Sequence, residues 1–151
     1  MDRVQLIETL REAEDTAELR AFETQLFDKE THVYVDDIAS YSGIEFEGFL
    51  RQLFVKMGYV VELTKITGDQ GADLVVEKLH ERSVVQAKRF AAKVGNKAVQ
   101  EIMAAISIYK ADKGIVVTNN YFTTAAMELA EANNIGMINR EKLEELINKY
   151  W

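Results

Sequence analysis

Hydrophobic residues recur at two different spacings along the chain, and each spacing predicts one kind of element. From Gly43 to Gly58 the large apolar side chains return every three or four positions, which predicts an amphipathic helix with one buried face. Short apolar runs rich in β-branched residues follow, and they predict three strands at about 59–66, 72–78 and 83–89. The buried face of the helix consists of Phe46, Phe49, Leu50, Leu53, Phe54 and Met57.

In the second half of the chain, helical and strand patterns alternate. Thr123 is a suitable N-cap for one of these helices, and Asn133 with Asn134 is typical of a turn after it. Alternation of this kind favours an α/β fold with a three-layer α/β/α core, in which helices cover both faces of a mixed central sheet. The expected elements are a helix at about 95–110, a strand at 114–118, a helix through 132, a strand at 135–138 and a helix from 140.

The first forty residues have a different character. Two amphipathic helices are expected within 1–30, which carries nine acidic and four basic residues, and 34–38 reads as a linker or short strand. Adjacent acids such as Asp36 and Asp37 are usually a cap or a solvated turn. We therefore expect an acidic helical segment at 1–40, used for packing or dimerisation, and one domain at 41–151.

Polar residues interrupt the two strands at 72–78 and 83–89 in a regular way. A turn at 79–82 would form a hairpin with Asp73 opposite Lys88 and Val75 opposite Gln86. Because side chains alternate along a strand, Asp73, Gln86 and Lys88 would then share one face. The apolar residues Leu74, Val76, Val85 and Ala87 would share the other.

A carboxylate, an amide and an ammonium on one face of a hairpin are suited to metal-assisted phosphodiester cleavage. The alternative is that Asp73 closes a turn while Gln86 and Lys88 form an ordinary solvated face. The apolar Val84 and Val85 favour the first interpretation, because they indicate a central strand and not an edge open to water.

A further carboxylate is expected from the helix at 43–58. On a helical wheel Glu47 lies at the border of the buried face, and Glu45 lies farther round on the opposite side. Glu47 is therefore the better candidate, although an acid in a first helical turn is usually only a favourable charge at the helix end.

Taken in order, these blocks resemble the Mrr-like branch of the PD-(D/E)xK restriction-endonuclease superfamily, over about residues 43 to 147. The resemblance implies a restriction-endonuclease-like fold with Asp73 as the central metal-ligand aspartate and Lys88 as the catalytic lysine. Gln86 stands where many members of the superfamily have an acid, and this glutamine is itself typical of the Mrr-like branch. The helical glutamate would be Glu47. The matching blocks are GIEFE at 43–47, GYVV at 58–61, GDQGADL at 68–74, VQAKR at 85–89, KVG at 93–95 and KGIVVT at 113–118, with Asp69 and Gln100 at secondary polar positions.

The expected cofactor is Mg²⁺, with Mn²⁺ as a substitute. Mg²⁺ prefers hard oxygen ligands, and the candidates are the carboxylates of Asp73 and Glu47, the side-chain oxygen of Gln86 and the backbone carbonyl of Ala87. Lys88 would orient or deprotonate the attacking water and stabilise the transition state.

Composition limits the size of the core, the kinds of metal site and the cellular location that can be expected. The chain of 151 residues is 48% hydrophobic and has no cysteine, so it can build one sizeable core and has neither disulfides nor cysteine zinc sites. His32 and His80 show no ligand spacing. Without a visible secretory signal or membrane-spanning run, a cytoplasmic location and no membrane partner are expected.

Net charge is −7, but its distribution is uneven. Residues 78–113 carry eight basic and three acidic residues, and the basic cluster of Arg89, Lys93 and Lys97 begins at the expected site. These side chains are candidate phosphate contacts, or else ordinary solvating charges.

The sequence thus predicts a Mg²⁺-dependent endonuclease acting on duplex DNA. A homodimer would suit cleavage of two antiparallel strands, and the expectation is either weak specificity or specificity supplied by a separate subunit or domain. The alternatives are a structure-specific nuclease similar to Holliday-junction resolvases, and a non-catalytic DNA-binding or assembly module with the same fold.

Overall fold

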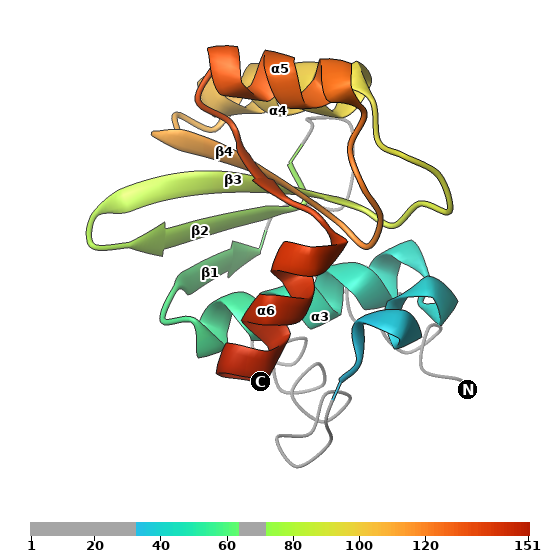
Figure 1. Ribbon diagram of the computed structural model, residues 1–151. Helices are drawn as coiled ribbons and strands as arrows, with labels where there is room; N and C mark the ends of the chain where they lie inside the picture. Colours follow the sequence, from blue (N-terminus) through green and yellow to red (C-terminus); the bar gives the residue numbers. More distant parts are fainter. Residues whose placement is uncertain (1–32, 64–71) are drawn as a thin grey trace.

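The computed structural model describes residues 33–63 and 72–151. A five-stranded sheet forms the middle layer, with α3 and α6 on one face and α4 and α5 on the other (Figure 1). The expected three-layer α/β/α architecture is confirmed. The elements are η1 (Val35–Ser40), α3 (Gly43–Lys56), β1 (Val60–Leu63), β2 (Leu74–Lys78), β3 (Glu81–Lys88), α4 (Asn96–Ile108), β4 (Lys113–Thr118), α5 (Thr124–Ala132), β5 (Gly136–Ile138) and α6 (Arg140–Tyr150).

The strands lie in the sheet in sequence order. β1, β2 and β3 pair antiparallel, whereas β3, β4 and β5 pair parallel through the crossovers α4 and α5, so the sheet is mixed as expected. β3 is the central strand, with β2 on one side and β4 on the other. The apolar run at Val84 and Val85 therefore belongs to a buried strand, as its composition predicts.

Alternate residues of the hairpin face two separate cores. Leu74, Val76 and Val85 pack with the aromatic face of α3 and with α6, and Ala87 contacts the same core. The opposite face packs against α4 and α5 through Val75 and Val84. This division matches the predicted alternation and leaves the polar residues at the end of the strands.

The turn between β2 and β3 differs from the expectation. It consists of Leu79 and His80 alone, both in the left-handed region with φ of 52° and 64°, so Lys78 pairs with Glu81. A two-residue turn of this kind matches the twist of the flanking strands. The register is shifted by two residues, and the ladder that pairs Leu74 with Val85 brings Asp73 opposite Gln86 and not opposite Lys88. An even shift keeps every side chain on its predicted face.

The prediction of a linker or strand at 34–38 was wrong, because this segment forms the 3₁₀ helix η1. Its Val35 and Ile38 are buried in the core beneath α3. Asp37 caps it by accepting from the Tyr34 N–H at 3.2 Å, and Asp36 pairs with Arg140 of α6. The expected helices of 1–30 lie outside the described residues.

Candidate active site

Helix α3 separates the roles of its two glutamates. Ser42 caps the helix, since its Oγ accepts from the Glu45 N–H at 3.0 Å while Glu45 Oε1 accepts from the Ser42 N–H at 3.3 Å. This reciprocal capping box engages Glu45 at the helix end. Glu47, half-buried, instead hydrogen-bonds Asp73. The structure therefore brings together the pair that the helical wheel favours.

Asp73 lies just before β2, and its side chain contacts both Glu47 of α3 and the backbone of Ala87 in β3. Its Oδ2 accepts from the Ala87 N–H at 2.6 Å, which fixes the carboxylate against β3. Burial, the charge of Glu47 and the hydrogen bond to Glu47 raise the pKa of Asp73 to about 7, although the Ala87 N–H and the charge of Lys88 act in the other direction. Two carboxyl groups that share a site in this way favour either a bound proton or a bound cation.

Gln86 and Lys88 point to the same side of the sheet and meet one acid of α4. Gln86 is only 5% exposed, and its Nε2 donates to Glu101 Oε2. Lys88 Nζ lies 3.1 Å from the same oxygen. Partial burial opposes ionisation of Glu101, but the hydrogen bonds from Lys88 and Gln86 and the charges of Lys88 and Lys97 outweigh it, so the pKa of Glu101 falls below its usual value.

Glu101 is the residue of this cluster that the sequence pattern did not select. Gln100, chosen as a secondary position, is exposed on α4, and its neighbour Glu101 makes the contacts instead. One signal was available, because α4 is the crossover that follows β3 and must pack over the face that carries Gln86 and Lys88. An acid there opposite a buried amide and a lysine is a natural partner.

The oxygen atoms at this site fit a hard divalent cation. Gln86 Oε1 is buried and makes no hydrogen bond within the described chain, while its amide nitrogen is already engaged by Glu101. Asp73 and Glu47 add two adjacent carboxyl groups, and Mg²⁺ accepts carboxylate and amide oxygens with water completing its shell. Among residues 33–63 and 72–151, no three acidic or histidine side chains form a metal cluster by themselves.

The remaining predicted residues lie around this centre. Lys93 and Lys97 are exposed, with Lys97 Nζ 3.9 Å from Glu101 Oε1, and Arg89 donates to the Ala39 carbonyl on the other side of the sheet. Their contact with DNA remains a prediction. His80 is an exposed turn residue, as expected, and Asp69 and His32 lie outside the described residues.

A mixed sheet that carries Asp73, Gln86 and Lys88 on its central hairpin, beside a helix that supplies Glu47, defines a protein of the restriction-endonuclease class. The chain belongs to the Mrr_cat restriction endonuclease family, whose pattern it matches over residues 38–147. This match confirms the Mrr-like PD-(D/E)xK relationship implied by the sequence blocks.

Individual relatives agree with this assignment. The chain is 29% identical over 122 residues to the type IV methyl-directed restriction enzyme EcoKMrr of Escherichia coli strain K12, covering 75% of this chain and 40% of that enzyme. Two solved structures share the fold. The DNA modification-dependent restriction endonuclease AspBHI has a TM-score of 0.62 at 17% identity, covering 84% of this chain and 35% of AspBHI. The protein of unknown function AF1548 has a TM-score of 0.57 at 19% identity, covering 67% of this chain and 62% of AF1548.

Among the described residues, no helix is long and apolar enough to cross a bilayer.

Proposed function

We propose that this protein is a Mg²⁺-dependent endonuclease that hydrolyses phosphodiester bonds of duplex DNA, with Mn²⁺ able to replace Mg²⁺. The observation that carries the proposal is the hydrogen-bonded pair Asp73 and Glu47, beside the buried Gln86 Oε1, which has no hydrogen-bond partner among the described residues. These three groups are the proposed metal ligands, together with the Ala87 carbonyl. Membership of a restriction endonuclease family supports the nuclease class.

The residues divide the chemistry between them. A divalent cation held there would polarise the phosphate and supply a water molecule of increased acidity. Attack of water on phosphorus would form one P–O bond and break the bond to the leaving sugar oxygen, which takes up a proton, while negative charge grows on the non-bridging oxygens. Lys88 would orient the water and stabilise this charge, and Glu101, whose Oε2 lies 3.1 Å from Lys88 Nζ, would hold the ammonium group in position.

The wider assembly is also part of the proposal. Arg89, Lys93 and Lys97 would contact DNA phosphates, and a homodimer would place one site on each strand. Sequence specificity would come from a separate subunit or domain, because the described residues are largely taken up by the catalytic fold. The chain spans 40% of EcoKMrr, its methyl-directed E. coli relative, so methylated DNA belongs among the test substrates.

The test is incubation with supercoiled plasmid, methylated plasmid and a four-way junction, in Mg²⁺, Mn²⁺ or EDTA. The variants are Asp73→Asn and Lys88→Met, with the exposed Glu128→Gln and Lys149→Met as matched charge controls. Metal-dependent cleavage that both site variants lose and both controls keep is the expected result. Preference for the junction would correct the substrate to branched DNA.

If no substrate is cut in either metal, while DNA binding is the same in the wild type and the two site variants, the protein is a binding module that retains the fold. Cleavage that survives in Asp73→Asn would remove this site from the mechanism.

A further inference from the structure

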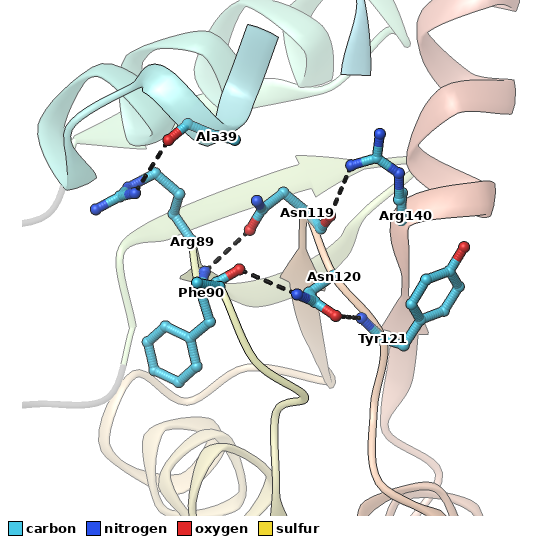
Figure 2. Close-up of a pocket in the computed structure, with 8 residues that line it drawn as sticks. Ala39, Arg89, Phe90, Asn119, Asn120, Tyr121 and Arg140 are labelled. Atoms are coloured by element: carbon cyan, nitrogen blue, oxygen red, sulfur yellow. Dashed lines mark hydrogen bonds between the residues drawn. The ribbon is translucent and has the colours of Figure 1, made fainter. Parts of the chain in front are cut away.

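A second polar pocket lies on the other side of β3 from Glu101. It has a volume of about 290 Å³ and is formed where β3 and β4 end, between η1 and the first residue of α6 (Figure 2). None of the residues that line it is acidic, and its charged members are Arg89 and Arg140. The pocket is thus positive at its walls and small enough for one nucleotide unit or less.

Asn119 offers one amide donor to this pocket, while its two oxygen atoms are engaged. Asn119 Oδ1 accepts from the Phe90 N–H at 2.9 Å, and the Asn119 carbonyl accepts from Arg140 Nη1 at 3.4 Å. By contrast, Asn119 Nδ2 makes no hydrogen bond within the described chain. The other amide, Asn120, is held by the backbone of Phe90 and Tyr121 (Figure 2).

Arg89 adds a second unsatisfied donor. Its Nε is buried and has no partner among the described residues, and its Nη1 makes only a long contact of 3.4 Å to the Ala39 carbonyl. A buried guanidinium N–H without an acceptor is costly. Because this nitrogen is shielded from solvent, the groups that Arg89 can offer to a ligand are its terminal Nη nitrogens. Figure 2 shows Arg89 and Arg140 on either side of Asn119, and all three residues line the pocket.

Arg140 contributes in two ways. It is the first residue of α6, an eleven-residue helix whose positive dipole end therefore borders the pocket. Its Nη2 pairs with Asp36, an exposed acid that does not line the pocket, and this pair holds the guanidinium near Asn119. A space bordered by the Asn119 amide donor and by two guanidinium groups, one of them paired with Asp36, favours a ligand rich in acceptors and negative in charge.

We infer that this pocket binds a backbone phosphate of the nucleic acid substrate, close to the phosphate that is cut. The inference rests on the proposed function and extends it to Asn119 and Arg140. Arg89 follows Lys88 directly at the end of β3, and their side chains point to opposite faces of the sheet, Lys88 toward α4 and Arg89 toward η1. A nucleic acid strand that crosses this end of the sheet would therefore reach both the active site and the pocket. The exposed rings of Phe90 and Tyr121 flank it and are suited to contact the neighbouring sugar or base.

The test uses Asn119→Asp, which keeps the shape and the acceptor for Phe90 but replaces the free donor by a negative charge. Asn148→Asp, exposed at the far end of α6, is the control with the same change in net charge. Both are made in the Asp73→Asn background and titrated with a fluorescein-labelled duplex in EDTA at several KCl concentrations. Arg140→Gln is measured alongside as a second pocket variant, and thermal unfolding is recorded for every protein.

Asn119→Asp should weaken DNA binding at least about tenfold and should lower the slope of log Kd against log salt by about one. Its melting temperature should not fall, because the new carboxylate lies between two arginines. Arg140→Gln should weaken binding in the same direction, and Asn148→Asp should stay within about twofold of its parent.

Equal affinity for DNA in Asn119→Asp and Asn148→Asp would overturn the inference. A second experiment with inorganic phosphate tests whether the pocket binds a free phosphate ion instead of a phosphate of the DNA backbone. If inorganic phosphate raises the melting temperature of the wild type and not of Asn119→Asp, while DNA affinity is unchanged, the pocket takes a free anion and the DNA assignment fails. Binding does not require cleavage, so loss of the nuclease proposal alone would leave the Asn119 effect intact.

Discussion

Asp73 and Glu47 place two carboxyl groups against each other in a partly buried site. Burial and the neighbouring glutamate raise the pKa of Asp73 to about 7, against an ordinary value of 3.8. Ionising both groups without a cation is therefore unfavourable, and this cost should be visible in the stability of the protein.

In EDTA, the wild type should lose stability as pH rises from about 4 to about 7. Over this window the folded state binds a proton at Asp73 that the unfolded state has released, so the free energy of unfolding falls with pH. Asp73→Asn has no carboxyl group to titrate at this position and keeps an acceptor for the Ala87 N–H. Its stability relative to the wild type should therefore grow between about pH 4 and about pH 7 in urea unfolding. A relative loss over that range would contradict the pairing with Glu47.

Glu101 is expected to act as a positioning residue, since it contacts both Gln86 and Lys88. Glu101→Gln should lower the turnover rate of DNA cleavage about tenfold with little change in KM, because outer-shell partners commonly have effects of 10- to 100-fold. Glu101→Asp should recover part of the rate, and the shape of the pH–rate profile should change. Glu128→Gln, the same change at an exposed position of α5, is the control. An unchanged rate in Glu101→Gln would assign Glu101 a structural role only.

For individual residues, the sequence predicted which side chains of the candidate site share a face, but it did not predict Glu101. The two-residue period of β3 places Gln86 and Lys88 on one face whatever the register, and the helical wheel distinguishes Glu47 from Glu45. Glu101 was missed because its approach depends on how α4 packs across the sheet, which no local period encodes. The close packing is visible at Gly114, where a Cβ would lie 2.9 Å from Ile102 Cγ1 of α4.

At the scale of elements, the hairpin of β2 and β3 carries most of the site and has an unfavourable turn sequence. Leu79 and His80 both adopt positive φ, which costs a residue with a Cβ about 1 kcal/mol or more. Leu79 and His80 are not residues that favour a two-residue turn, so a longer turn was expected. The helices were easier to predict, because their caps are sequence-local: Thr123 accepts from the Ala126 N–H at 3.1 Å.

Replacing Leu79 by Asn and His80 by Gly should raise the free energy of unfolding by about 1 kcal/mol, because Asn-Gly is favoured in this turn type. Leu79 is 89% exposed, so little packing is lost. Urea unfolding in EDTA is the measurement. Glu81→Gly, one residue farther along in β3, should be destabilising instead. If the double variant were less stable than the wild type, the two-residue turn would be wrong.

In the whole molecule, all three layers contribute side chains to the candidate site at one end of the sheet. Glu47 comes from α3 and Glu101 from α4. The middle layer contributes Gln86 and Lys88 of β3, and Asp73 directly before β2. The alternation of helix and strand patterns predicts these layers, but the prediction of a linker or short strand at 34–38 was wrong. Val33, Val35 and Ile38 complete the core beneath α3, and their short apolar run has no period that distinguishes a 3₁₀ helix from a strand.

The most direct test of the proposed metal site is the single-turnover rate of cleavage of a labelled duplex, measured as a function of Mg²⁺ concentration. The wild type should show a saturable rate, and Lys88→Met should lower the maximum about 100-fold or more while the half-saturating Mg²⁺ concentration stays the same. Asp73→Asn should show no cleavage at any Mg²⁺ concentration. A wild-type rate that does not depend on Mg²⁺, or an Asp73→Asn curve that overlays the wild type, would contradict the metal site.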